Sequence, residues 1–196
     1  MAERNSLTNF VVEKFKKNTM SQKTKWVIDP THTEISFKVK HMMFTNVTGK
    51  ITKYEALVET TGDDFTGAMV EFTGDTDSIT TGTADRDAHL LSPDFFDAAQ
   101  FPKINFNVTS FTKLDEGDFT VTGDLSLHGE TKPITLAAEF GGLMKDPWGN
   151  IKAAFSLSGK INRKDWGLVW NAALETGGVL VSDEVRIIAE VQLIKQ

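Results

Sequence analysis

Four side chains within one short stretch combine the donors and acceptors that binding and catalytic sites use. They are Asp85, Arg86, Asp87 and His89, and they lie in the segment TGTADRDAHLLSPDFFDAAQFP, residues 81–102. Two aspartates and a histidine could ligate a metal ion, and a histidine beside a carboxylate could act as an acid or a base. Arg86, Asp87 and His89 could instead pair with one another, as a polar gate beside an opening or as a structural network.

The rest of the sequence argues against the metal and catalytic alternatives. The chain has no cysteine, and its four histidines, at 32, 41, 89 and 128, show no recognised metal-ligand spacing. It contains no nucleophile elbow, phosphate-binding loop or HExxH motif. We therefore expect no metal and no cofactor, and the polar gate and the structural network remain open.

The same segment carries helix signals. Asp85 and His89 are four residues apart, so they share a face on a helical turn. Ser92 followed by a proline is typical of a helix start, with the serine as N-cap. We expect a short helical insertion near residues 84–99, whose aromatic side chains plug or cover one end of the fold.

The composition is that of a soluble globular chain with an acidic balance. Charged residues make up 24% and hydrophobic residues 40% of the 196 residues, enough for one domain with a substantial core. A net charge of -6 argues against nucleic acid as the partner, because binding phosphates requires a basic face. No apolar run is long enough for a transmembrane helix.

The regular hydrophobic pattern begins only at Trp26. We interpret residues 1–22 as a polar N-terminal extension, helical or disordered, and Met20 as an alternative start. The early apolar run at residues 10–12 is too short for a secretory signal. We therefore expect a cytoplasmic protein in which residues 23–196 form one domain.

Alternation of apolar and polar residues dominates the rest of the chain. It runs through residues 35–41, 103–111, 118–128, 134–140, 151–161 and 185–193. Turn signals such as His128-Gly129-Glu130 separate these runs. A period of two with short turns predicts an antiparallel all-β fold, either a sandwich or a closed barrel. Because several strands exceed the usual length of about five to six residues, we expect an up-and-down barrel.

The face that would point into such a barrel is almost wholly apolar. In the first run, for example, Ile35, Phe37 and Val39 lie on one face, and Ser36 and Lys38 on the other. A barrel of about eight strands has room inside for packed side chains or for one small ligand. The pattern alone leaves a packed core and a ligand cavity as equal alternatives.

Several segments, in this order along the chain, resemble hallmarks of the YceI-like family, also called the polyisoprenoid-binding family. They are DPTHTEISFKVKHM (29–42), SITTGTADRDAHLLSPDFFDAAQFPKINF (78–106), GDLSLHGETKPITL (123–136), INRKDWGL (161–168) and VSDEVRII (181–188). The resemblance implies an eight-stranded antiparallel lipocalin-like barrel with a short helical insertion and a long apolar tunnel. Known relatives bind polyisoprenoids, isoprenoid-quinone-like molecules or fatty amides there, and many are periplasmic.

This resemblance implies a ligand site with an apolar wall and a polar mouth. For the mouth we name His41, Arg86, Asp87 and His89. Weaker candidates are Asn162, Arg163 and Asp165, because their segment is typical of a turn with an ion pair. For the tunnel wall we name Ile35, Phe37, Val39, Phe95, Phe96, Phe106, Val108, Phe119, Val121, Leu136, Phe140, Phe155 and Leu157.

The function that follows from this resemblance is lipid binding. We expect the chain to bind, and to carry or store, a long-chain isoprenoid or a related lipid, either quinone-like or a fatty amide. We do not expect an enzyme. The alternative is an enzyme or stress-response protein that acts on such a lipid, with His89 or His41 as the acid or base. An exposed edge or apolar rim could also support a homodimer.

Overall fold

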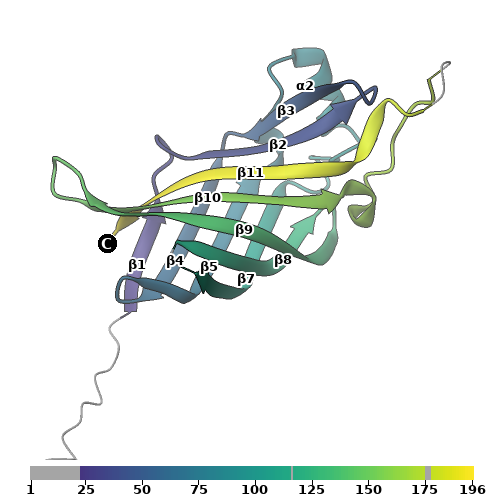
Figure 1. Ribbon diagram of the computed structural model, residues 1–196. Helices are drawn as coiled ribbons and strands as arrows, with labels where there is room; N and C mark the ends of the chain where they lie inside the picture. Colours follow the sequence, from purple (N-terminus) through teal and green to yellow (C-terminus); the bar gives the residue numbers. More distant parts are fainter. Residues whose placement is uncertain (1–22, 116, 175–177) are drawn as a thin grey trace, which may run out of the picture.

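Antiparallel strands curve around into a closed barrel (Figure 1). The computed structural model describes residues 23–115, 117–174 and 178–196, and the extension predicted for residues 1–22, with Met20, lies outside them. The strands are β1 (Lys23–Ile28), β2 (Glu34–His41), β3 (Thr45–Ile51), β4 (Tyr54–Thr61), β5 (Asp64–Asp75), β6 (Ile79–Thr80), β7 (Lys103–Asp115), β8 (Asp118–Leu127), β9 (Glu130–Lys145), β10 (Ile151–Asn162) and β11 (Val181–Lys195).

These segments make eight strand paths, because three pairs of successive strands each continue one path. β1 pairs with β4 while β2 pairs with β3, so β1–β2 and β3–β4 form one long interrupted hairpin. β5 and β6 continue one another in the same way against β4 and β3. β11 closes the barrel, since it pairs with β10 on one side and with β2 and then β1 on the other. The predicted eight-stranded antiparallel barrel is confirmed.

The three interruptions lie side by side in the barrel wall. They fall at residues 29–33, at residues 52–53 and at the 3₁₀ turn η1 (Thr76–Ser78). Hydroxyl groups bridge them: the backbone N–H of Lys53 donates to Ser78 Oγ over 3.0 Å, and Tyr54 Oη donates to the carbonyl of Thr33 over 2.7 Å. The strand ladder is thus replaced locally by side-chain hydrogen bonds.

The alternation in the sequence produces the barrel wall directly. Along β8 every second residue is buried, from Phe119 to Leu127. Glycines sit at the predicted turns with positive φ, for example Gly129 at 78°. Lengths of 16 residues for β9 and 15 for β11 explain why a barrel forms rather than a compact sandwich.

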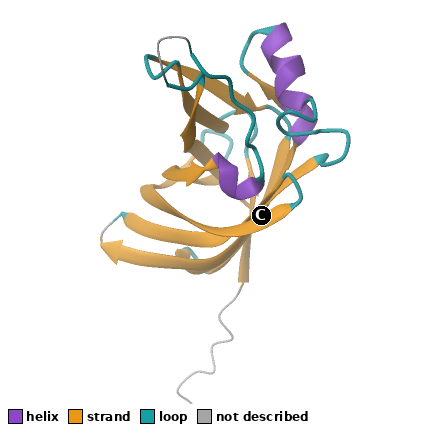
Figure 2. Ribbon diagram, turned by 90° about the vertical axis from the view of Figure 1, so that its right-hand side faces the viewer, coloured by secondary structure: helices purple, strands orange, loops and turns teal. Residues whose placement is uncertain are grey.

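A single α-helix among the described residues, α2 (Ala84–Leu91), is inserted between β6 and β7. It lies at the same end of the strands as the 3₁₀ turn η2 (Arg163–Trp166), as Figure 2 shows. The predicted helix start at Ser92 is wrong. Its hydroxyl donates to the carbonyl of His89 over 2.7 Å at the end of α2, and the following residues form turns. Ser92 bonds equally well to a carbonyl at a helix end, which the sequence pattern did not distinguish.

The buried carboxylate of Asp29 anchors the first interruption, residues 29–33, to the neighbouring strands of the barrel. Asp29 accepts hydrogen bonds from Lys152 Nζ and Thr31 Oγ1, at 2.9 and 2.7 Å, and lies 2.9 Å from His32 Nδ1. Burial raises the pKa of Asp29, but these hydrogen bonds outweigh burial and hold the pKa well below its ordinary value near 4. The carboxylate therefore adds stability above about pH 4, and this stability is lost as the pH falls through the lowered pKa.

Replacing Asp29 with asparagine is expected to lower the free energy of unfolding at pH 7 by about 2 kcal/mol, because a charge-assisted network is lost. The difference from the unsubstituted chain should shrink as the pH falls below about 4. Denaturant unfolding at pH 7 and at successively lower pH measures both. Asp63→Asn is the control: Asp63 pairs with Lys195 at the surface, so its change should stay below about 0.5 kcal/mol. An equal loss in the two variants contradicts the role assigned to Asp29.

Candidate functional site

An elongated cavity of about 260 Å³ runs inside the barrel. Its lining comes from the inward faces of the strands and from the α2 insertion. On β8 the lining extends from Val121 to Leu127, which corresponds to about 20 Å of strand. Among the described residues that line it, only Ser36 and Arg163 have polar side chains. The interior is therefore a hollow apolar space rather than a packed core.

The predicted wall residues lie around this cavity with two exceptions. Phe119 and Phe140 face inward but are not part of the lining. Both pack against Phe155, with ring centroids 6.2 and 4.9 Å apart, at the β1 end of the barrel. They belong to the core beneath the cavity, and whether the residues that do line it contact a ligand stays a prediction.

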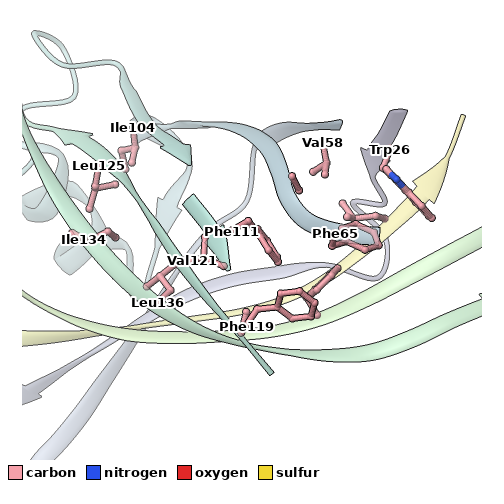
Figure 3. Packing of buried hydrophobic residues seen from close by; sticks show 14 of the residues in the cluster. Trp26, Val58, Phe65, Ile104, Phe111, Phe119, Val121, Leu125, Ile134 and Leu136 are labelled. Atoms are coloured by element: carbon pink, nitrogen blue, oxygen red, sulfur yellow. The ribbon is translucent and has the colours of Figure 1, made fainter. Parts of the chain in front are cut away.

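Aromatic rings fill the β1 end of the barrel. We call this group the aromatic plug: Trp26, Phe65, Phe119, Phe140 and Phe155. Phe65 lies at its centre, with centroids 5.1 Å from Trp26 and 4.8 Å from Phe155. Figure 3 shows Trp26 and Phe65 on one side of the interior and Ile104, Leu125 and Ile134 on the other, with Phe119 between the two groups. Ring packing of this kind ends the cavity with a solid wall.

Arg86 and Asp87 form a network that holds the loop before α2. Asp87 accepts hydrogen bonds from Thr80 Oγ1 at 2.6 Å and from the backbone N–H of Thr81 at 2.7 Å. Arg86 Nε donates to the Thr81 hydroxyl over 2.7 Å, so Arg86 and Asp87 meet through one threonine. Burial raises the pKa of Asp87, but the hydrogen bonds to the carboxylate outweigh it and lower the pKa. Neither side chain is part of the cavity lining.

His89 does not join that network. Its Nε2 lies 2.9 Å from Asp94 Oδ2, and its ring packs edge-on against Phe95 and Trp170 at 5.1 and 4.8 Å. The neighbouring Leu90, with Phe95, lines the cavity, so α2 contributes its apolar side to the interior. The histidine itself lies behind that layer.

His41 lies at the end of β2, half-buried and opposite Val181 of β11. Like Arg86, Asp87 and His89, it is not part of the cavity lining. The four predicted mouth residues thus gather at the α2 end without forming one cluster. Their contact with a ligand stays a prediction.

Arg163 is the charged side chain that does line the cavity. It follows β10 in η2 and is 3% exposed. Its Nε donates to the carbonyl of Ser182 over 3.0 Å, and Nη1 donates to the carbonyl of Leu168. Burial lowers the pKa of Arg163, and the nearby carboxylate of Asp183 partly offsets that effect. The other weak candidates behave as turn residues, since Asn162 Oδ1 accepts from the backbone N–H of Lys164 and Asp165 is exposed.

Asp183 was missed by the sequence reasoning. The pairing of β11 with β2 shifts between Val181 and Val185, which places Asp183 in a β-bulge. Asp183 Oδ1 lies 3.6 Å from Arg163 Nη2, and Oδ2 lies 2.9 Å from Lys164 Nζ. Bulges commonly redirect a side chain in this way. The signal in the sequence was a polar residue at an inward position of an otherwise apolar alternating run.

Two features are absent from the described residues. Within residues 23–115, 117–174 and 178–196, no group of three or more histidine, aspartate or glutamate side chains could hold a metal ion. In the same part of the chain, no helix has the length and apolar character needed to cross a bilayer.

Comparison with known proteins agrees with this geometry. The chain is 37% identical over 170 residues to a UPF0312 protein of Staphylococcus epidermidis, covering 86% of this chain and 96% of that protein. A YceI protein of Campylobacter jejuni, 30% identical, superposes with a TM-score of 0.70, covering 80% of this chain and 90% of that one.

A more distant neighbour is a polyisoprenoid binding domain from Saccharophagus degradans, with a TM-score of 0.63 and coverage of 87% and 98%. At 15% identity this likeness shows the fold alone. The model of the YceI-like domain matches residues 26–193. This chain therefore belongs to the YceI-like domain family.

Proposed function

We propose that this protein binds one long-chain apolar lipid, an isoprenoid or a related fatty chain, inside the barrel. The observation that carries the proposal is the elongated cavity with an almost wholly apolar lining. Water is poorly stabilised inside an apolar cavity, because it finds no polar partners there. A hydrocarbon chain gains about 0.8 kcal/mol for each buried CH₂ group, partly offset by the ordering of the chain.

Membership of the YceI-like domain family and the fold shared with a polyisoprenoid binding domain support this class of ligand. Selection of the hydrocarbon tail inside such a cavity depends on the length and width of the tail rather than on hydrogen bonds. The aromatic plug limits the length, since a chain that enters from the α2 end meets it at the β1 end. We further propose that the protein carries or stores its lipid, because burial removes the chain from water.

Native mass spectrometry of gently purified protein tests the proposal, followed by solvent extraction and identification of the released lipid. We expect one lipid per chain, and uptake of an added C20 prenyl alcohol by protein from which the lipid has been removed. Protein that neither retains a lipid nor takes up the alcohol would contradict the proposal. Faster transfer of a prenyl lipid between donor and acceptor vesicles in the presence of the protein would separate carriage from storage.

A further inference from the structure

Arg163 keeps part of its hydrogen-bonding capacity unused. A guanidinium group has five N–H donors. Backbone carbonyls take Nε and Nη1, but Nη2 is buried and has no hydrogen-bond partner among the described residues. Leaving a buried charged donor unpaired is costly, so this nitrogen calls for a partner.

Asp183 leaves a matching acceptor unused. Its Oδ1 is likewise buried without a hydrogen-bond partner in the described part of the chain, whereas Oδ2 faces Lys164. The distance of 3.6 Å between Arg163 Nη2 and Asp183 Oδ1 is too long for a hydrogen bond. The attraction between the two charges remains, but each atom still lacks a hydrogen-bond partner. A third group placed between them could satisfy both.

This incomplete pair lies at the edge of the cavity: Arg163 is part of the lining, whereas Asp183 is not, and its side chain is 42% exposed. Arg163 is the charged residue in the lining, and Leu168, Val181 and Val185 line the cavity around it. The pair lies at the α2 end, because Val181 pairs with His41 at the end of β2. A lipid whose hydrocarbon tail points toward the aromatic plug would have its polar head group beside this pair.

We propose that Arg163 and Asp183 form the head-group site of the lipid that the proposed function requires. The pair suits a neutral group that accepts one hydrogen bond from Nη2 and donates one to Oδ1, such as a hydroxyl or a primary amide. An oxygen or amide between the two atoms can lie about 2.8 Å from each. An ether or a quinone carbonyl leaves Oδ1 unpaired, and a phosphate places negative charge against it.

Three C20 probes that differ only at the head test this site: geranylgeraniol, its methyl ether and its monophosphate. Binding is measured by displacement of a fluorescent fatty probe from protein stripped of lipid. We expect the alcohol to bind about tenfold more tightly than the ether and the phosphate, because each of these loses or opposes the contact with Asp183.

Asp183→Asn removes the carboxylate charge at nearly constant size. In this variant the preference for the alcohol over the phosphate should therefore fall about tenfold. Glu184→Gln is the matched control. Glu184 lies in the same bulge, but it is exposed and pairs with Lys160 at 3.1 Å, so its selectivity should equal that of the unsubstituted chain. Arg163→Lys retains the positive charge but not the forked geometry of the guanidinium group. Only its affinity for the alcohol should fall, to about the affinity for the ether.

The outcomes separate this proposal from the proposed function. Binding of all three probes with equal affinity, unchanged in Asp183→Asn, overturns the head-group site and leaves lipid binding intact. A phosphate that binds more tightly than the alcohol overturns the choice of a neutral head. Failure of all three probes to bind overturns the proposed function and this site together. Thermal unfolding of each variant confirms that selectivity is compared between folded proteins.

Discussion

Replacing Ala189 with phenylalanine is expected to weaken lipid binding about 50-fold while the barrel stays folded. Ala189 lies in the middle of β11, between Leu157 and Ile35 on the neighbouring strands, and all three residues line the cavity. The added ring points into empty space, so overpacking costs little. If it displaces about three CH₂ groups of the guest, the loss is about 2.4 kcal/mol, or about 50-fold in Kd.

Titration of lipid-free protein with geranylgeraniol measures this effect. Ala137→Phe is the matched control, because Ala137 lies on the outer face of β9 and its substitution should leave Kd unchanged. Ala56→Phe fills the cavity from β4 and repeats the test should Ala189→Phe not fold. Unchanged binding by both cavity-filling variants would place the lipid elsewhere on the protein.

Replacing Trp26 with alanine is expected to lower the free energy of unfolding by about 4 kcal/mol, the largest stability loss we predict for one side chain. Trp26 is 0% exposed, packs against Phe65 in the aromatic plug and donates from Nε1 to Thr60 Oγ1 over 2.9 Å. The variant loses the burial of an indole and leaves a cavity beneath Phe65. For a chain of this size, the melting temperature should fall by roughly 10 °C.

Trp148→Ala provides the same chemical change at an exposed position. Trp148 is 84% exposed in the turn between β9 and β10, so its removal should change the free energy of unfolding by less than about 0.5 kcal/mol. Denaturant unfolding compares the two variants. Similar losses in both would show that the plug does not anchor the β1 end.

The second half of the barrel could be predicted from the sequence, and most of the first half could not. In β8 each face has its own character, so the alternation is clear. In β4 and β5 the exposed faces carry Leu57 and Met69, at 41% and 57% exposure, beside inward Val58 and Val70. Apolar residues on both faces erase the period of two. A register shift between Glu59 and Thr61 weakens the pattern further.

The apolar wall was predictable because the face of a strand follows from parity. The depth of a residue along the barrel does not follow from parity. For this reason Phe119 and Phe140 were predicted in the wall of the cavity, although they belong to the aromatic plug. The hollow itself could not be derived from the pattern, since a packed core and a cavity have the same alternation.

The polar residues were harder to place than the apolar ones. Arg86 and Asp87 attract attention in the sequence because they are crowded together, yet they bond to Thr81 and hold a loop. Arg163 and Asp183 lie in different segments, and only the fold brings them to 3.6 Å. Both occupy positions that continue an inward-facing row of odd-numbered residues. A charge at such a position is a stronger indication of a site than a cluster of charges in a loop.

The interrupted strand paths give the barrel wall unequal stiffness around its circumference. β8, β9 and β10 are continuous strands, whereas the paths β1–β2, β3–β4 and β5–β6 are each interrupted, and hydroxyl groups such as those of Ser78 and Tyr54 bridge the interruptions. Because strand ladders are missing at these interruptions, the amides of residues 29–33, 52–53 and 76–78 should exchange with deuterated solvent before those of the continuous strands. We therefore expect the barrel wall to open at these interruptions before it opens beside the aromatic plug.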